Sequence, residues 1–391
     1  MSNRLTTSES VLMIEEYLNQ NYELRFNVLS KKIEVRTREE GDTFTPLCNK
    51  KLNSIIRKVK MELDDVVNVK QNVQEYIDSE DIQQYDPICD WLHTLPKWDG
   101  QNRVAELFGR IPGITSEQIY WCSIWMRSAV AHWLGIDALH ANENIPTLIG
   151  EQGCGKSTFC RRLLPPHLSE FFLDHINLSN KFDKEIALTN NLLVNLDELD
   201  QIRPSQQPEI KQTVSKVKVN GRQIYGHDQQ DRKRYASFVS TTNNPHPLQD
   251  PTGSRRYLCI RIPNGTIIDN EAYIDYEQMY AQVMEEVVEK KCRYWFSNEE
   301  TLQIQHVNSQ FQQEQDLCTM LETCFRHAQE GEAAKMMPVK KIMEILEQQY
   351  PLVKKSHSFT IQIGLKLKSL GFSQKFIHGT SCYDTIPTVS S

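Results

Sequence analysis

The sequence predicts a mixed α/β protein with a parallel sheet at its centre, a mainly helical region before it and a small basic domain after it. Three observations lead to this prediction. A glycine-rich loop with the pattern G-x-x-x-x-G-K-[ST] lies at 150–157, between an apolar strand and a helix. Two further apolar runs, 191–196 and 236–242, end in polar residues. Near-continuous apolar runs are typical of strands buried in a parallel sheet.

The composition is that of an ordinary globular protein with two or three domains, since the chain has 391 residues, 39% of them hydrophobic and 24% charged. No apolar run approaches the length of a membrane span, and the first residues do not resemble a signal peptide. The ten cysteines are scattered and form no C-x-x-C pair. We therefore expect reduced cysteines, no zinc site, a cytoplasmic location and no membrane partner. The net charge of −7 argues against nucleic-acid binding over the whole surface, but it allows local basic patches.

Residues 1–79 predict a mostly helical adaptor region with a β interruption. Helical spacing of apolar residues occurs at 11–18, 53–63 and 67–77, and strand-like runs occur at 24–29 and 32–35. A region that only packs against the rest of the chain is an equal alternative.

Residues 80–145 predict a helical subdomain that leads into the sheet. A helix opens at 85–88, a turn follows at 95–100, and 119–134 predicts a long helix rich in aromatic residues. Tyr120, Trp121, Trp125 and Trp133 recur along that helix at a spacing that is usual for a core, so we expect them to be buried.

The glycine-rich loop opens the predicted core, residues 146–270. Its glycines allow the backbone to curl so that successive N–H groups point at an anion, and the helix that follows directs its positive end at the same place. We expect ATP as the ligand, bound by Gly150, Gly153, Cys154, Gly155, Lys156, Ser157 and Thr158. Lys156 would reach the β and γ phosphates, and the Ser157 hydroxyl would help to hold Mg²⁺. A glycine-rich turn without a ligand is the alternative.

Two carboxylates end the strand predicted at 191–196, which follows another short strand at 171–173. In a nucleotide hydrolase an Asp in the place of Asp197 holds Mg²⁺, and a Glu in the place of Glu198 polarises the attacking water as a general base. A strand capped by two solvated acids is the alternative.

The last predicted strand, 236–242, ends at Asn243, whose amide can bind the γ-phosphate and the lytic water. Arg255 and Arg256 follow twelve and thirteen residues later. A guanidinium near the γ-phosphate stabilises the charge of the transition state. An isolated Arg pair is usually a surface feature, so this prediction depends on the order of the four elements.

A basic segment, 211–234, lies between the two carboxylates and the last strand. Asn220-Gly221 predicts a hairpin turn within it. The cations expected to contact DNA phosphates are Lys216, Lys218, Arg222, Arg232, Lys233 and Arg234. A solvated hairpin and a subunit contact are the alternatives.

The rest of the chain predicts a helical lid at 271–330 and a basic domain at 331–391. Helices at 338–350 and 360–370, the second ended by Gly371, precede a hairpin that turns near Gly379. This order is typical of a winged helix, which would place Lys366 and Lys368 in a DNA groove. A domain used only for protein contacts is the alternative.

Taken together, the loop, the Asp-Glu strand end, the basic segment, Thr241-Thr242-Asn243 and Gly253-Ser254-Arg255-Arg256 resemble the virulence-associated E (VapE-like) family of phages and mobile elements. That family is similar to the superfamily 3 helicases of the AAA+ class. Leu95-Pro96-Lys97-Trp98-Asp99-Gly100 also resembles its lead-in to the ATPase. The resemblance covers roughly residues 80–300.

The resemblance implies a DNA-dependent P-loop ATPase that uses ATP and Mg²⁺ and assembles as a homo-oligomer, with a hexameric ring as one arrangement. It makes Lys156, Glu198 and Asn243 catalytic, with Asn243 as the sensor, and it makes Arg255 or Arg256 the finger that enters a neighbouring subunit's site. No primase site is evident in this chain, so a separate primase would make any primer.

Two hypotheses of different classes follow. The first is an ATP-driven motor on single-stranded or forked DNA, a replicative helicase of a phage or mobile element. The second is a nucleotide-gated DNA-binding switch, an initiator or defence component that does not unwind DNA. A small-molecule kinase is a weaker third, because phosphoryl transfer to a small acceptor does not require the Asp-Glu, Asn and Arg elements.

Overall fold

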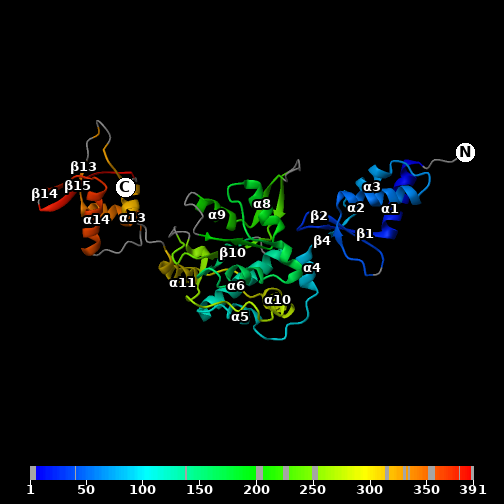
Figure 1. Ribbon diagram of the computed structural model, residues 1–391, viewed down its shortest axis with the longest axis horizontal. Helices are drawn as coiled ribbons and strands as arrows, with labels where there is room; N and C mark the ends of the chain where they lie inside the picture. Colours follow the sequence, from blue (N-terminus) through cyan, green and yellow to red (C-terminus); the bar gives the residue numbers. More distant parts are fainter. Residues whose placement is uncertain are drawn as a thin grey trace. The chain divides into compact units, whose positions relative to one another are not determined.

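The computed structural model describes residues 6–39, 41–136, 139–199, 206–222, 229–248, 254–312, 317–328, 332, 335–350, 357–377 and 379–388. Figure 1 colours the chain by residue number. The chain divides into two compact units. Unit 1 comprises residues 1–245 and 255–307, and unit 2 comprises residues 246–254 and 308–391. Among the described residues, no helix is long and apolar enough to cross a membrane.

Unit 1 begins with a small sheet packed against three helices. The strands are β1 (Tyr22–Asn27), β2 (Lys32–Thr37), β3 (Thr45–Pro46) and β4 (Gln83–Tyr85), in the order β3-β2-β1-β4. The helices are α1 (Thr7–Asn21), α2 (Asn49–Glu62) and α3 (Val69–Ile77). Both predicted strands are present, but the sheet has two more. Strands of two or three residues, such as β3 and β4, are too short to leave an alternating pattern in the sequence.

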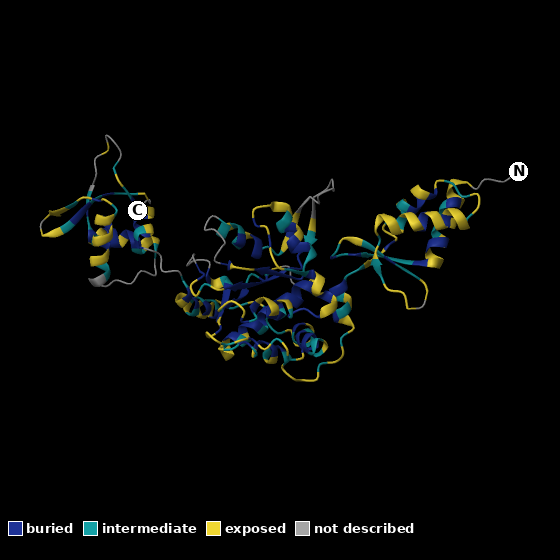
Figure 2. Cartoon of the chain, in the orientation of Figure 1, coloured by how far each residue is buried: buried dark blue, intermediate teal, exposed yellow. Residues whose placement is uncertain are grey.

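A five-stranded parallel sheet forms the centre of unit 1. Its order is β11 (Tyr257–Arg261), β5 (Ile145–Ile149), β10 (Ser237–Thr242), β7 (Leu193–Leu196) and β6 (Phe172–Leu173). Every residue of β5, β7 and β10 is buried, and Figure 2 shows this buried centre. The parallel sheet was predicted correctly. The edge strand β11 was not predicted, although the apolar run 257–260 was a visible signal.

Helices cover both faces of this sheet. Figure 1 shows α8 and α9 on one side and α5, α6 and α10 on the other. The helices of this part are α4 (Pro87–His93), α5 (Arg103–Phe108), α6 (Ser116–Leu134), α7 (Lys156–Arg161), α8 (Lys181–Asn190), α9 (Gln207–Val214), α10 (Tyr276–Met284) and α11 (Asn298–Asn308), with the short 3₁₀ helices η1 (Pro166–Phe171) and η4 (Ser254–Arg256) and the π-helix η5 (Glu285–Glu289). The three α6 tryptophans are at most 1% exposed, as predicted. Tyr120 is 46% exposed, so its predicted burial was wrong, because it lies on the outer side of α6.

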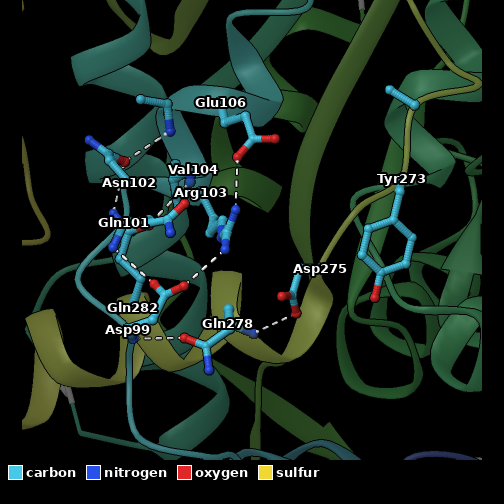
Figure 3. A network of polar contacts seen from close by, with 12 residues as sticks. Asp99, Gln101, Asn102, Arg103, Val104, Glu106, Tyr273, Asp275, Gln278 and Gln282 are labelled. Carbon is cyan, nitrogen blue, oxygen red and sulfur yellow. Dashed lines mark hydrogen bonds and ion pairs between the residues drawn. The ribbon is translucent and has the colours of Figure 1, made fainter.

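Polar contacts fix the segment before α5 onto α10 (Figure 3). The Asp99 amide donates to Gln278 Oε1 at 2.8 Å, and the Val104 amide donates to Gln282 Oε1 at 3.1 Å. Arg103 pairs with Asp99 at 2.9 Å. The turn predicted at 95–100 is therefore tied to a helix almost 180 residues later in the chain.

The basic segment forms a hairpin of β8 (Lys218–Arg222) and β9 (Gln229–Lys233). Asn220 pairs with Asp231 and Gly221 with Gln230, so Asn220-Gly221 lies within β8. The predicted Asn-Gly turn is wrong, and the connection falls on residues 223–228, outside the described part. Val219, which is 0% exposed, sets the register, since burial of one face outweighs a local turn preference.

Unit 2 contains α12 (Leu317–Cys324), β12 (Phe325–Arg326), β13 (Lys335–Pro338), α13 (Val339–Gln349), α14 (His357–Ser369), β14 (Gln374–Ile377) and β15 (Thr380–Pro387). Its strands run in the order β12-β15-β13, and β14 pairs with β15. The two predicted helices and the hairpin at Gly379 are present, and Gly371 ends α14 with a φ of +85°. The predicted boundary at 331 needs correction, because Leu321 of α12 packs in the core of unit 2 with Ile342 and Ile363.

Candidate nucleotide-binding site

Three neighbouring strands of the central sheet end at one pocket. Because β5, β10 and β7 are parallel, the segments that follow them meet at the same edge. The pocket has a volume of about 320 Å³. Its described lining consists of Gln152, Gly153, Gly155, Lys156, Ser157, Thr158, Asp197, Glu198, Thr241, Thr242 and Asn243. The pocket thus brings together the loop and the ends of two strands, as the order of the motifs predicted. These residues are up to 91 positions apart in the sequence.

The loop after β5 requires glycine at three positions. Gly153 and Gly155 have φ of +83° and +89°, in the left-handed region that favours glycine. A Cβ at Gly155 would lie 2.5 Å from Asn270 Nδ2, and one at Gly150 would lie 3.0 Å from Ile262 Cβ. Gly150 and the buried Cys154 are not among the described residues that line the pocket, while the other predicted loop residues line it.

The segment that follows β11 carries no motif, but it forms hydrogen bonds with the loop. The Ile268 amide donates to the Cys154 carbonyl, and Asn270 Nδ2 donates to the Gly155 carbonyl, both at 3.0 Å. The Gly265 amide donates to Glu151 Oε2 at 3.1 Å. Nothing in residues 262–270 marks this role in the sequence, since it depends on β11 lying beside β5.

Lys156 connects the loop to the end of β10. Its side chain is buried, and Nζ donates to the carbonyls of Gly150 at 2.8 Å and Glu151 at 2.7 Å. Nζ also donates to Asn243 Oδ1 at 2.8 Å. An ammonium has three donors, so these contacts use all of them. Lys156 and Asn243, which were predicted from separate motifs, are therefore in contact. A phosphate oxygen can replace the amide oxygen of Asn243 at Nζ.

Asp197 and Glu198 both face the pocket, although successive residues of a strand point to opposite faces. This is possible because β7 ends at Leu196 and Glu198 has a φ of +49°. For a residue other than glycine this conformation is uncommon, and such residues cluster at functional sites. The Thr241 hydroxyl donates to Asp197 Oδ1 and orients that carboxylate. Thr241 lies two residues before Asn243, and both line the pocket at the end of β10.

The oxygen-donor set at this edge fits Mg²⁺. Ser157 supplies a hydroxyl and Asp197 a carboxylate, and both residues line the pocket. Mg²⁺ prefers such hard oxygen ligands and retains several waters, for which the open pocket has space.

Arg255 and Arg256 lie at the opposite edge of the sheet. Tyr257 pairs with Ile145 and Arg261 with Ile149, so the arginines precede β11 at the edge where β5 begins. The loop follows the other end of β5, which is about 16 Å away at 3.3 Å per residue. Neither arginine is among the described residues that line the pocket. Both instead approach Glu143, Arg255 at 3.8 Å and Arg256 at 3.3 Å.

Three of the predicted DNA-binding cations point into the protein. Arg234 is 1% exposed and donates to the carbonyls of Val214 and Lys216, both at 2.6 Å, of Ala236 at 2.8 Å and of Asn142 at 3.0 Å. Burial lowers the pKa of Arg234 to about 9, and the charge of Glu143 opposes this shift, so the guanidinium is charged at neutral pH. Because its donors are occupied, we remove Arg234 from the predicted DNA contacts.

Lys233 and Arg232 are also engaged. Lys233 Nζ bonds the Trp133 carbonyl at 2.5 Å and pairs with Asp86 at 3.3 Å. Arg232 pairs with Glu185 at 2.5 Å, and the two side chains are 13% and 4% exposed. The buried Arg232–Glu185 pair and the partly exposed Lys233–Asp86 pair position β9 and leave these charges poorly placed for phosphates.

Other predicted cations are accessible. Lys218 is 57% exposed and pairs with Asp231. Lys216 is half-buried, and both Lys366 and Lys368 are exposed on α14. Arg222 belongs to β8, but its side chain lies outside the described part.

The fold and the site define a class, namely mixed α/β proteins with a parallel sheet that carries a glycine-rich loop and acidic residues at its carboxyl edge. The virulence-associated protein E-like domain matches residues 92–313, more than half of the chain. The chain belongs to this family, as its motifs predicted. No protein of curated function matches it.

Solved structures that resemble the chain include two apo structures of the NrS-1 C-terminal region. The A form is 14% identical and has a TM-score of 0.46, with 96% of this chain and 99% of that chain covered. The structure of NrS-1 residues 305–718 is 12% identical and has a TM-score of 0.44, with 98% of this chain and all of that chain covered.

Proposed function

We propose that the protein hydrolyses ATP and uses the energy to move on DNA, as a replicative helicase of a phage or mobile element. The observation that carries this proposal is the contact of Lys156 with Asn243, at a pocket that also holds Asp197 and Glu198. Phosphate binding needs only the loop and its lysine. Carboxylates and an amide at the same place are what hydrolysis requires in addition.

Each residue then has a defined task. Lys156 and the loop amides bind the β and γ phosphates, and Ser157 and Asp197 hold Mg²⁺, which neutralises phosphate charge. Glu198 accepts a proton from the attacking water, and Asn243 orients that water against the γ-phosphate. When Lys156 Nζ leaves Asn243 and binds a phosphate, the Asn243 amide would become free to orient the water.

We also propose that the site is completed by a neighbouring subunit. The Arg255-Arg256 pair cannot reach the nucleotide of its own subunit across the length of β5. A homo-oligomer with head-to-tail contacts would bring the arginine edge of one subunit to the loop edge of the next, and such contacts close into rings. A trans-acting guanidinium accelerates phosphoryl transfer by about 10³ to 10⁵.

Accessible cations suggest where DNA binds. Lys218 on the hairpin and Lys366 and Lys368 on α14 are exposed. Unit 2 has the order helix, two strands, two helices and hairpin, and we propose that it is a winged-helix-like domain whose α14 enters a groove. Phosphate contacts of this kind would give binding that weakens steeply with salt.

Steady-state hydrolysis of ATP with and without single-stranded DNA tests this function. We expect DNA to stimulate hydrolysis, EDTA to stop it, and Lys156→Ala to abolish it in protein that is still folded at the assay temperature. Lys181→Ala is the matched control, because that lysine is 74% exposed and is not among the described residues of the pocket. Hydrolysis that Lys156→Ala leaves intact would refute the assignment of the site.

Strand displacement separates the motor from a nucleotide-gated switch. The inward direction of Arg232, Lys233 and Arg234 reduces the number of phosphate contacts that the hairpin offers, whether the protein is a motor or a switch. A motor displaces a labelled strand only with hydrolysable ATP. A switch binds the same fork with ATP but displaces nothing.

A further inference from the structure

We propose that Arg255 is the residue that reaches the neighbouring subunit's nucleotide, and that Arg256 is a positioning residue that connects this finger to the basic hairpin through Ser215 and Glu143. The inference rests on the proposed inter-subunit hydrolysis. It assigns different tasks to two adjacent arginines that the sequence does not distinguish.

Exposure separates the two arginines. The side chain of Arg255 is 46% exposed, whereas that of Arg256 is 13% exposed. Arg255 approaches Glu143 only to 3.8 Å, and exposed ion pairs of this kind contribute little and exchange readily. The backbone of Arg255 is nevertheless held, because Asn144 Nδ2 donates to its carbonyl at 3.1 Å. A fixed backbone with an exposed guanidinium suits a group that must bind a partner's phosphate.

Arg256 is instead part of a network of hydrogen bonds. Its Nη2 donates to Ser215 Oγ at 3.2 Å and pairs with Glu143 Oε2 at 3.3 Å. Ser215 Oγ in turn donates to Glu143 Oε2 at 2.8 Å. These three side chains come from the turn η4 before β11, the segment before β5 and the end of α9, so they join three separate parts of the chain.

The same network reaches the hairpin at both of its ends. Ser215 lies three residues before Lys218, where β8 begins, and Arg234 directly follows β9. Arg234 donates to the carbonyls on both sides of Ser215, those of Val214 and Lys216, and to the carbonyl of Asn142, next to Glu143. A displacement of the hairpin strands therefore moves Ser215 and Glu143, and with them the side chain of Arg256.

This arrangement couples DNA to hydrolysis. When Arg255 leaves Glu143 for the γ-phosphate of the neighbour, Glu143 retains its contacts with Arg256 and Ser215. The position of the hairpin then determines how well Arg255 is directed at the neighbour's site. DNA bound at the hairpin would thus change the rate of hydrolysis in the next subunit.

Three variants test the two tasks, with full-length protein, ATP and single-stranded DNA. We expect Arg255→Ala to lower kcat by about 10³ or more and to leave the binding of a fluorescent ATP analogue unchanged. We expect Arg256→Ala to retain more hydrolysis than Arg255→Ala. Ser215→Ala leaves both arginines in place, and it should retain hydrolysis without DNA but lose most of the stimulation by DNA.

A mixing experiment tests whether Arg255 acts in trans. Arg255→Ala and Lys156→Ala subunits are each inactive alone, but in a randomly mixed ring about one interface in four joins an intact loop to an intact arginine. We therefore expect the mixture to regain hydrolysis.

The assignment is overturned if Arg256→Ala loses hydrolysis while Arg255→Ala keeps it, or if the mixture stays inactive. Full stimulation of Ser215→Ala by DNA would overturn the coupling. If the wild-type protein hydrolyses no ATP at all, the proposed function itself has failed.

Discussion

Replacement of Arg234 by Met distinguishes a structural arginine from one that binds DNA. Methionine keeps much of the apolar stem but removes all donors, so four backbone carbonyls lose a charged partner. Each buried acceptor left unsatisfied costs about 1 to 3 kcal/mol. Taking the low end, because water can reach some of the carbonyls, gives a loss of about 4 kcal/mol. For a domain of this size that loss corresponds to a melting temperature lower by about 10 °C.

Tryptophan fluorescence is the appropriate assay, since all six tryptophans of the chain belong to unit 1. Trp133 is close to the change, because its Nε1 donates to the carbonyl of Tyr235 at 2.9 Å. Lys218→Met is the matched control. That lysine lies on the same hairpin but is 57% exposed, so the Lys218→Met protein should melt near the temperature of the wild type. If Arg234→Met melts like the control but loses affinity for DNA, the structural role is refuted.

Three further changes have expected outcomes. Gly155→Ala places a Cβ 2.5 Å from Asn270 Nδ2 at a φ of +89°, so it should weaken the thermal stabilisation by ATP and Mg²⁺, whereas Gly41→Ala, at φ +84° with open space, should not. Glu198→Gln should bind the nucleotide normally but lower kcat by about 10² to 10⁴, and an unchanged kcat would exclude Glu198 as the base. Burial raises the pKa of Glu300, but Arg293 and Ser297 outweigh it and hold the pKa at about 2, below the unfolded value of about 4.3. The stability contributed by the Glu300–Arg293 pair is present above the pKa of Glu300 in the unfolded chain and is lost as the pH falls towards 2. The difference in melting temperature between the wild type and Glu300→Gln should therefore shrink from pH 7 to pH 3.

Much of the candidate site could be predicted because its residues lie in short local patterns. The loop at 150–157 and the ends of two apolar strands each carry a signal within nine residues. Parallel strands leave their carboxyl ends at one edge, so the order of these signals was enough to expect Lys156, Asp197 and Asn243 in one pocket.

The basic segment shows the opposite case. The sequence of 211–234 displays seven cations but not which way each one points. Their directions depend on partners that are distant in the chain, such as Glu185 for Arg232 and the Trp133 carbonyl for Lys233. Val219 shows the same limit, since its burial moved the turn away from Asn220-Gly221.

By itself the sequence determined the family, the parallel sheet and the chemical groups of the candidate site, because each depends on residues that are close in the chain and on strand order. Only the tertiary structure decided that the arginine pair lies at the far edge of the sheet and that Arg255 and Arg256 differ in exposure. It also decided that Arg234 is buried among carbonyls from α9 and from the segment before β5. The physical reason is that burial and hydrogen-bond partners are set by which elements pack together, and a sequence pattern records only which residues are available to be packed.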